Sequence, residues 1–230
     1  LPVVLLIGQY GFGDKVFTTI KVTVYTMVGS LLMFVAILYL GVAYHNEFGE
    51  WSFAYDKLMQ ITTIDYNAKV WLFLAFLSAF AIKIPIFPLH TWIMETYKNA
   101  PTGAVFLLSS IMAKLGVYAI VRFMIPLFPE IYVEFSMWFV VIGLFGLIYF
   151  GIAALMQDDI KRMFAYSSAS HLSFISAGIF SLNSYGINGA LYLIIAHAIA
   201  TGALFLLVGL IHEQTGFKTI KDLGGIAKKA

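Results

Sequence analysis

The sequence contains no cysteine and few charged residues. Its 230 residues include 14 Lys or Arg and 12 Asp or Glu, so 11% are charged, against about 25% in an ordinary soluble domain. A chain without cysteine forms no disulfide and holds no thiolate-bound metal or Cys-ligated iron–sulfur cluster. Any electron-transfer chemistry must therefore reside on another subunit. The formal net charge of +2 is too small to indicate nucleic-acid binding.

Apolar residues are abundant instead. They make up 61% of the chain, aromatic residues make up 17%, and the mean hydropathy is +0.90. This composition predicts an integral membrane protein. A lipid bilayer admits only helices or closed barrels, and barrel strands alternate polar and apolar residues over about 10 positions. The apolar segments here do not alternate, so the predicted fold is an all-α, polytopic transmembrane helix bundle.

Gaps between charged residues predict where the chain crosses the membrane, because a spanning helix needs about 20 mostly apolar residues. Six segments are long enough when one lysine is allowed within a segment and the polar break at residues 181–186 divides the last charge-free stretch in two. The predicted spans are residues 22–44, 70–89, 99–121, 135–157, 163–181 and 189–211. Residues 1–7 are interpreted as the end of a further span. Residues 1–212 are thus predicted to form the bundle, and residues 213–230 a basic tail leading to another span, as in a fragment of a longer protein.

The loops carry two further signals. Residues 45–69 form the one long polar connection, and its aromatic residues predict a short element at the membrane surface. Because successive loops lie on opposite sides of the membrane, the basic residues can be sorted by side, and the richer side is predicted to be cytoplasmic. That side collects Lys15, Lys21, Lys98, Lys161, Arg162, Lys218, Lys221, Lys228 and Lys229, and the other collects Lys57, Lys69 and Arg122.

Two lysines, Lys83 and Lys114, lie inside predicted spans. A lysine near the centre of a spanning helix opposes insertion by roughly 2.5–3.5 kcal/mol. Water, a carboxylate or loss of the proton must offset that cost, and these spans contain no Asp or Glu as a partner. An amine that readily gains and loses a proton is a proton carrier. The competing interpretation is that the two lysines only join neighbouring helices.

Pro85 and Pro88 follow Lys83 directly. Each proline removes a backbone donor and clashes with the preceding turn, so the helix is predicted to break just past the lysine. Broken helices at membrane depth occur where the backbone is buried in protein or lines a water-filled cavity. The other interpretation is a helix that simply ends near Pro88. His90, at this span boundary, is expected in a solvated loop.

His171 and His197 lie near the middles of the last two predicted spans. Histidine exchanges protons near neutral pH. Ser167 is one turn before His171 and Thr201 is one turn after His197, so a hydroxyl is expected near each imidazole. With the two lysines, the histidines predict a polar axis within the membrane. Ser110 is counted as a further supporting hydroxyl, and no metal site is predicted.

Several motifs together resemble one known family. They are Ala81-Ile-Lys-Ile-Pro-Ile-Phe-Pro-Leu-His-Thr-Trp92, Ala100-Pro-Thr102, Ala113-Lys-Leu-Gly-Val-Tyr118 and Asp159-Ile-Lys-Arg-Met-Phe-Ala-Tyr-Ser-Ser168, followed by Ser170-His171. This set is similar to the core of the antiporter-like proton-translocating subunits of respiratory complex I, and most similar to their M-type, or chain 4, branch. The resemblance extends over nearly the whole chain.

The resemblance implies a subunit of a proton-pumping NADH-quinone oxidoreductase that has no redox site of its own. NADH, FMN, iron–sulfur clusters and quinone would be bound by other subunits, and quinone reduction there would drive proton movement here. Lys83, Lys114, His171 and His197 would form the proton relay, with Pro85, Pro88, Ser110, Ser167 and Thr201 in support. The expected partners are the other membrane subunits, including neighbouring antiporter-like subunits, and the lipids of a bacterial cytoplasmic (inner) membrane.

The sequence departs from the family pattern at Ile93-Met-Glu-Thr-Tyr97, where Leu-Pro-Asp-Ala-His is common. Two alternative functions stay open from the residues alone. One is a sodium/proton antiporter, or a subunit of one, because such antiporters share these motifs. The other is a membrane scaffold whose lysines are structural contacts between helices.

Overall fold

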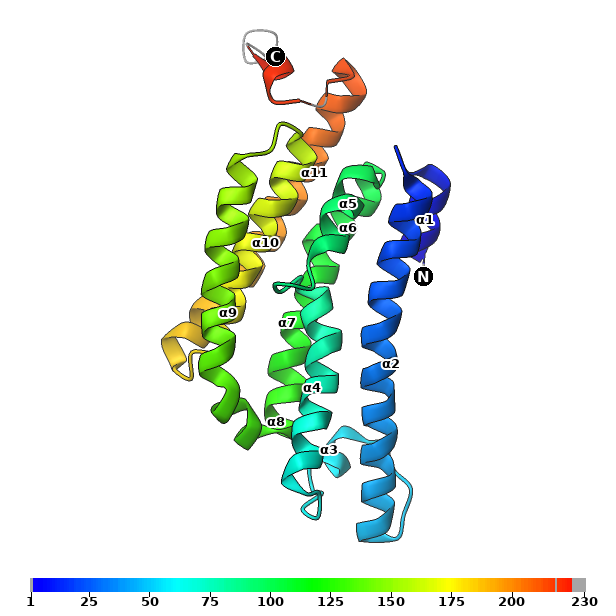
Figure 1. Cartoon of the computed structure of the whole chain (residues 1–230), viewed down its shortest axis with the longest axis vertical. Coiled ribbons are helices and arrows are strands. Elements are labelled where there is room, and N and C mark those ends of the chain that lie inside the picture. Colours follow the sequence, from blue (N-terminus) through cyan, green and yellow to red (C-terminus); the bar gives the residue numbers. More distant parts are fainter. Residues whose placement is uncertain (1, 218, 225–230) are drawn as a thin grey trace.

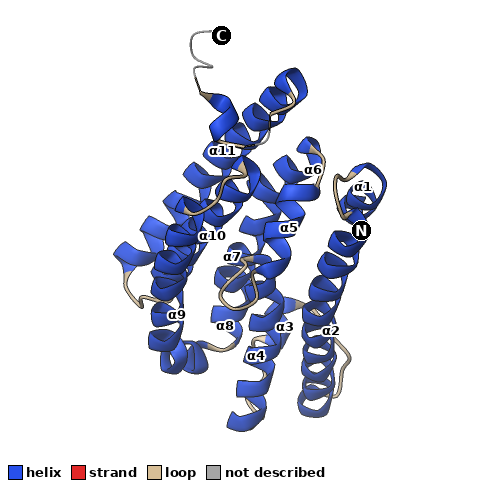
Figure 2. Ribbon diagram, turned by 45° about the horizontal axis from the view of Figure 1, so that its top comes forward, coloured by secondary structure: helices blue, strands red, loops and turns tan. Residues whose placement is uncertain are grey.

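The computed structural model describes residues 2–217 and 219–224, and the regular structure over these residues is helical apart from one isolated bridge between Asp159 and Thr219. Figure 2 shows the helices and their short connections. The helices are α1 (Pro2–Tyr10), α2 (Lys15–Phe48), α3 (Tyr55–Leu58), α4 (Tyr66–Lys83), α5 (Thr91–Asn99), α6 (Thr102–Leu107), α7 (Ala113–Ala119), α8 (Ile125–Leu127), α9 (Pro129–Leu155), α10 (Ile160–Ile179) and α11 (Ser184–Thr215). Two π-helical turns, η1 (Leu108–Met112) and η2 (Ile120–Met124), and a 3₁₀ turn, η3 (Lys221–Leu223), complete the set. The all-α bundle predicted from the sequence is confirmed.

The long helices stand side by side (Figure 1). Helix α2 packs on α4, α9 packs on α10, and α11 packs on α10 and on the α6–η1 segment. Helices α4 and α5 lie one above the other in the middle of the bundle, with the proline-containing segment between them. The broken helix predicted from Pro85 and Pro88 is therefore present, and the chain resumes as a helix beyond the break.

Among the described residues, four helices are long and apolar enough to cross a membrane: Lys15–Phe48, Thr102–Leu127, Pro129–Leu155 and Ser184–Thr215. The predicted span 70–89 covers most of α4 and the break that follows it, and most of the predicted span 163–181 lies in α10, whose five serines lower its hydropathy. The count of six spans and the division of the chain at residue 212 stay predictions. Within the predicted tail, Lys218, Lys228 and Lys229 lie outside the described residues.

Side chains in the sequence explain where several helices begin and end. Asp14, Asp65 and Asp159 accept backbone N–H groups at the starts of α2, α4 and α10, because the first N–H groups of a helix have no partner within it. Gly49 and Gly216 end α2 and α11 with left-handed φ angles of 77° and 73°, a conformation that glycine adopts without steric cost. The turns between the spans are thus encoded locally.

Small residues allow α9 and α10 to approach closely. A Cβ atom added at Gly146 would lie 2.7 Å from Ser173 Oγ, and one at Gly143 would lie 2.9 Å from the Ser173 carbonyl oxygen. Ser170 Oγ also donates to the carbonyl of Leu147 at 2.8 Å. Close backbone approach at small residues is a typical basis of helix association in membranes, where lipid supplies no hydrophobic drive.

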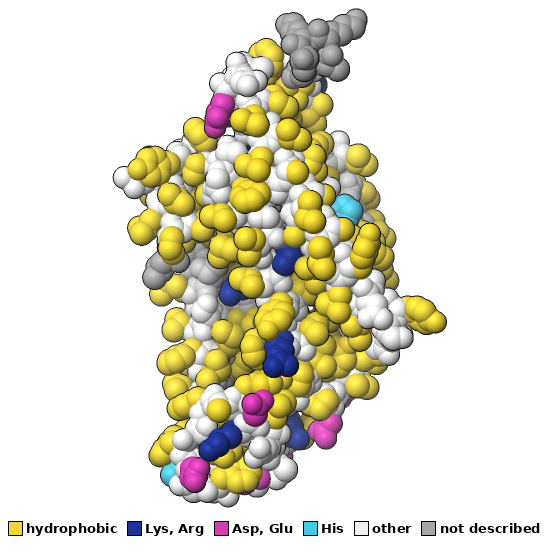
Figure 3. All heavy atoms as spheres, turned by 180° about the vertical axis from the view of Figure 1, so that it is seen from behind, with side chains coloured by type: hydrophobic (Ala, Val, Ile, Leu, Met, Phe, Trp, Pro, Cys, Tyr) yellow, Lys and Arg dark blue, Asp and Glu magenta, His cyan; other side chains and the backbone are white. Residues whose placement is uncertain are grey.

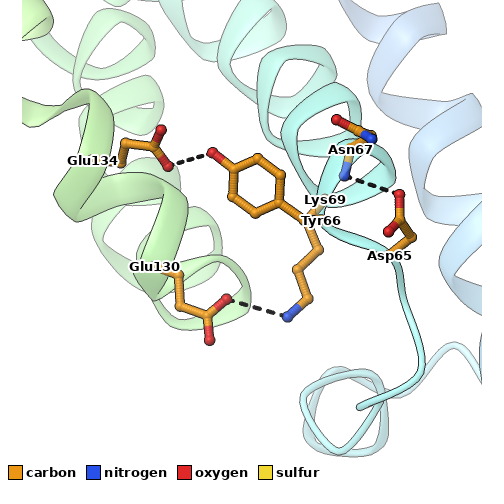
Figure 4. Close-up of polar contacts among 6 residues, drawn as sticks. All are labelled: Asp65, Tyr66, Asn67, Lys69, Glu130 and Glu134. Atoms are coloured by element: carbon orange, nitrogen blue, oxygen red, sulfur yellow. Dashed lines mark hydrogen bonds and ion pairs between the residues drawn. The ribbon is translucent and has the colours of Figure 1, made fainter.

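A polar cluster closes the lower end of the bundle in Figure 1 and joins the start of α4 to the start of α9 (Figure 4). Lys69 Nζ lies 3.3 Å from the Glu130 carboxylate, and the Tyr66 hydroxyl donates to Glu134. Asp65 caps α4 beside them through the backbone N–H of Asn67. Nearby, the predicted surface element is present as the short helix α3, where the Tyr55 hydroxyl donates to the Arg122 carbonyl at 2.7 Å. We refer to Asp65, Tyr66, Lys69, Glu130 and Glu134 as the end cluster.

Candidate functional site

Lys114 lies on α7 between the two π-helical turns η1 and η2. In η1 the backbone N–H of Ala113 reaches the carbonyl of Leu108, five residues back instead of four. Such turns widen a helix locally, and they are frequent at functional sites because the wider turn changes which carbonyls are accessible to other donors. The Lys114 amine donates to the carbonyl of Ser109 in that turn. The local backbone thus provides an acceptor for the lysine inside the apolar bundle.

The Lys114 side chain is buried, with 7% of its surface exposed. Its Nζ atom also lies 3.5 Å from Thr201 Oγ1 on α11, and that hydroxyl lies 3.5 Å from the Ser109 carbonyl oxygen. Among the ion pairs formed by the described residues, none includes Lys114 or Lys83.

His197 continues this polar group along α11. Its imidazole is buried, and both ring nitrogens are enclosed without a hydrogen-bond partner among the described residues. The ring centroid of His171, on α10, lies 5.5 Å from that of His197. The two histidines predicted to share an axis are therefore adjacent, although the His171 side chain is exposed on the flank of the described bundle.

The hydroxyls expected beside the imidazoles lie differently. Thr201 Oγ1 donates to the backbone carbonyl of His197 at 2.6 Å and not to its ring, because a threonine in a helix reaches the carbonyl four residues earlier. Ser110 Oγ is bonded in the same way to the carbonyl of Phe106 at 2.6 Å. Within the described chain, no hydrogen bond joins Ser167 to His171. The Thr201 and Ser110 hydroxyls thus bond helix backbone carbonyls, and the supporting role of Ser167 and Thr201 beside the imidazoles stays a prediction.

Lys83 is the last residue of α4 and is partly buried. It lies against the helix that carries Lys114, because a Cβ atom added at Gly116 would lie 3.1 Å from Lys83 Cβ and 2.7 Å from Ile84 Cγ1. Gly116 therefore permits a contact between α4 and α7 that a larger residue would prevent. Lys83 thus forms part of this contact, and Lys114 lies two residues from it on the neighbouring helix.

The helix break after Lys83 is packed tightly. His90, which its position at a span boundary suggested would lie in a solvated loop, is 6% exposed. Its ring stacks at 5.6 Å on Phe87 and lies 4.7 Å from the ring of Phe150 on α9. The loop interpretation was wrong because the chain continues as α5 and keeps this residue inside the bundle. In the sequence, only the helical pattern that resumes at residue 91 could have indicated that His90 is buried.

The segment that departs from the family pattern forms the first turns of α5. Tyr97 is completely buried, and its ring meets that of Phe205 edge-on at 5.1 Å. Its hydroxyl finds no hydrogen-bond partner among the residues described. The substitution of tyrosine for histidine therefore keeps a polar atom in the interior.

Two hollows adjoin this interior. A groove of about 790 Å³ runs between the α6–α8 segment and α11, with Ser110 and Lys114 along one wall and Ile195 and Ile199 along the other. Figure 3 shows one face of the molecule, on which a few Lys and Arg side chains interrupt an otherwise apolar middle. A second cavity, of about 260 Å³, lies at the opposite end from the end cluster and is lined by Glu95 and Lys98 among others. In the part of the chain that is described, no group of His, Asp or Glu has a geometry able to hold a metal ion.

The whole chain, residues 1–230, matches the family described as NADH:quinone oxidoreductase/Mrp antiporter, TM. The chain belongs to this family. It is 35% identical over 230 residues to NADH-quinone oxidoreductase subunit M of Rickettsia prowazekii, covering 100% of this chain and 46% of that protein. It is 32% identical to NADH-ubiquinone oxidoreductase chain 4 of Marchantia polymorpha, covering 98% of this chain and 44% of that protein.

Solved structures agree with the family. Respiratory complex I from Thermus thermophilus contains a chain that matches with a TM-score of 0.86 and 33% identity, covering 95% of this chain and 46% of that one. The Mrp complex from a Dietzia species matches with a TM-score of 0.74 and 23% identity, covering 93% of this chain and 23% of that one, and shows the shared fold alone. The resemblance to the M-type branch drawn from the motifs is confirmed. The chain spans about half the length of these curated relatives.

The family assignment and the apolar helices make this chain part of a multi-pass membrane protein. Rickettsia and Thermus are bacteria, and their relatives of this chain support an inner-membrane location. The relatives carry the names of NADH-quinone and NADH-ubiquinone oxidoreductase subunits.

Proposed function

We propose that this chain translocates protons across the membrane as part of a non-redox subunit of NADH-quinone oxidoreductase. The proton relay comprises Lys83, Lys114, His197 and His171. Quinone reduction elsewhere in the complex drives it, and NADH, FMN, iron–sulfur clusters and quinone are bound by other subunits. The partners are the other membrane subunits, including neighbouring antiporter-like subunits, and the bilayer.

The observation that carries this proposal is the continuity of the polar group around Lys114. Its amine shares the Ser109 carbonyl with Thr201, and His197 stands one turn away on the same helix as Thr201. The ring nitrogens of His197 are enclosed without a protein partner, and buried polar groups of this kind are normally satisfied by ordered water. Water between the imidazole and its neighbours would provide the hydrogen-bonded connection that proton transfer requires.

The physical logic of the relay follows from the lack of a fixed counter-charge. A lysine locked to a carboxylate would stay charged, whereas an amine held by a carbonyl and a hydroxyl has partners that accept hydrogen bonds from both of its protonation states. A low-dielectric environment disfavours the charged form. The proton on Lys114 can therefore leave when a charge arrives or departs nearby. Among the relay residues, Lys83 on the adjacent helix α4 is the one nearest to Lys114 in the sequence.

The test is to replace Lys114 by alanine in the assembled complex, with Lys69→Ala in the end cluster as the matched control. We expect Lys114→Ala to assemble, to keep quinone reduction measurable and to lose proton pumping in sealed vesicles, while Lys69→Ala pumps normally. A Lys114→Ala complex that pumps as well as the parent would refute the relay. Failure of Lys114→Ala to assemble would instead favour the scaffold interpretation.

The shared fold with the Mrp complex keeps a sodium/proton antiporter as the second candidate. Its driving force distinguishes it, because an antiporter exchanges ions across vesicle membranes without NADH or quinone. We expect no sodium-dependent proton movement in vesicles that contain the complex but lack both substrates. Exchange under those conditions would favour the antiporter.

A further inference from the structure

The break after α4 leaves backbone carbonyls that the helix itself does not bond. Pro85 has no N–H to donate, and the next donor, the backbone N–H of Ile86, bonds to the carbonyl of Ala81 at 3.0 Å. The carbonyl of Ile82, which directly precedes Lys83, is thereby left without a partner within the helix. Inside a membrane bundle such a group needs a donor from elsewhere in the protein, because lipid provides none.

Trp92 provides that donor. Its indole Nε1–H donates to the carbonyl of Ile82 at 3.0 Å in a buried hydrogen bond. Trp92 lies in the first turn of α5 and is 5% exposed. Long side chains in a helix lean toward its N-terminus, so a tryptophan at this position points back across the break toward the end of α4. The hydrogen bond therefore connects the two halves of the broken helix.

The end of α4 is also packed against α7. A Cβ atom at Gly116 would lie 3.1 Å from both Lys83 Cβ and the Phe80 carbonyl oxygen. The end of α4 around Lys83 thus contacts both the indole of Trp92 and the helix that carries Lys114. Because the Ile82 carbonyl and the Lys83 N–H belong to one planar peptide, holding that carbonyl restricts how the Lys83 residue can rotate.

We propose that Trp92 is a positioning residue for Lys83: by occupying the carbonyl of Ile82 that the break leaves open, its indole N–H fixes the direction in which the Lys83 side chain leaves α4. The importance of that direction for transport rests on the proposed function, whereas the positioning itself does not. Trp92 does not exchange protons. It acts through the backbone that precedes the lysine.

The chain contains no cysteine, so a thiol introduced by Lys83→Cys is unique within it and reports its own accessibility. The rate at which a water-soluble maleimide modifies this thiol is measured in the assembled complex by peptide mass spectrometry. In the Trp92→Phe background, which keeps an aromatic ring and removes the N–H, we expect the rate to change by about fivefold, the factor that one buried hydrogen bond is typically worth. Trp71→Phe is the matched control, since Trp71 lies on α4, the helix of residue 83, and is 73% exposed.

Equal modification rates in the Trp92→Phe and Trp71→Phe backgrounds would overturn the proposal. If Trp92→Phe does not assemble, Trp92→His replaces it, because histidine retains a ring N–H. A rate close to the parent's in that variant supports the proposal, and a rate shifted by about fivefold or more overturns it.

Proton pumping separates this inference from the proposed function. In complexes that retain Lys83, we expect Trp92→Phe to lower the number of protons pumped per NADH oxidised and to shift its pH profile, whereas Trp71→Phe leaves both unchanged. If Lys83→Ala pumps like the parent, the proposed role of Lys83 fails, while the thiol measurement still decides whether Trp92 positions residue 83.

Discussion

Lys114 in the centre of the bundle and Lys69 in the end cluster are the same residue in opposite surroundings. Lys69 is 27% exposed and pairs with Glu130 at 3.3 Å. Lys114 is 7% exposed, and among the described residues its partners are a carbonyl and a hydroxyl. An ion pair near water contributes at most about 1 kcal/mol. A buried amine without a counter-charge costs stability, and such a cost is retained where function needs a mobile proton.

The two regions therefore hold their helices together by different means. The end cluster uses charge pairs between α4 and α9 that salt can screen. The centre uses close packing around Gly116 and the hydrogen bonds that Lys114 and, from α11, Thr201 donate to the Ser109 carbonyl in the π-helical turn η1. We expect substitutions in the centre to change transport or, where they disturb the close packing, stability, and substitutions in the end cluster to have small and local effects.

The largest effect is expected from Gly116→Ala. The added Cβ would lie 2.7 Å from Ile84 Cγ1 and 3.1 Å from the Phe80 carbonyl oxygen. Because a backbone atom cannot move aside as a side chain can, α4 and α7 must separate, which should cost about 1–3 kcal/mol of stability. The thermal unfolding midpoint Tm of the assembled complex measures this loss.

Gly103→Ala is the matched control, because a Cβ at Gly103 meets nothing within 4 Å. Alanine in a helix is favoured over glycine by roughly 0.5–1 kcal/mol, so this variant should be as stable as the parent or slightly more stable. A Gly116→Ala complex with the same Tm as Gly103→Ala would show that the centre is not tightly packed.

An intermediate effect is expected from Thr201→Val, which removes the hydroxyl 3.5 Å from the Lys114 amine while keeping the shape of the side chain. Loss of one buried hydrogen bond, worth about 1 kcal/mol, should slow proton translocation about fivefold. The rate of acidification in vesicles at matched NADH oxidation measures it. Thr215→Val is the control, since Thr215 makes the same backward bond to a helix carbonyl, at 2.7 Å, but is exposed. Equal rates in the two variants would contradict a role for the Thr201 hydroxyl.

The smallest effect is expected in the end cluster, outside the predicted span 70–89. The hydrogen bond to the Glu134 carboxylate raises the pKa of Tyr66. Because the folded-state pKa is raised, the stability that this bond contributes is present below the ordinary tyrosine pKa and is lost as pH rises through the raised pKa. Glu134→Gln should lower the pKa of Tyr66 toward its ordinary value without changing proton pumping.

A difference titration of tyrosinate absorbance, with Tyr66→Phe as the reference, measures that shift. Glu130→Gln is the control, because Glu130 pairs with Lys69 and not with Tyr66. A pKa of Tyr66 that is the same in both glutamine variants would show that the Glu134 carboxylate does not hold the phenol. Any effect of Glu134→Gln on pumping would contradict the division between the two regions.

Much of the fold could be predicted from the sequence, because the bilayer forces the backbone into helices and the charged residues mark the ends of the apolar segments. Pro85 and Pro88 predicted the break for a similarly local reason. The candidate residues Lys83, Lys114, His171 and His197 were also visible as polar residues in apolar stretches. The positions of these features depend on sequence spacing alone.

Their partners could not be predicted in the same way. The spacing predicted that Thr201 would lie near His197 but could not show that its hydroxyl donates to the backbone carbonyl of His197. His90 was expected in a loop but is enclosed by aromatic rings from α9. The contact of Trp92 with the Ile82 carbonyl joins residues on either side of a break whose geometry the sequence does not specify.

By itself, the sequence determined that this chain is a helical membrane protein with two lysines and two histidines within apolar segments, since composition and spacing suffice for that. Only the tertiary structure decided that Lys114 meets Ser109 and Thr201, that His171 and His197 are neighbours and that Gly116 brings α4 against α7. These contacts arise where separate helices cross, and a helical pattern specifies which residues share a face but not which other helix that face will meet.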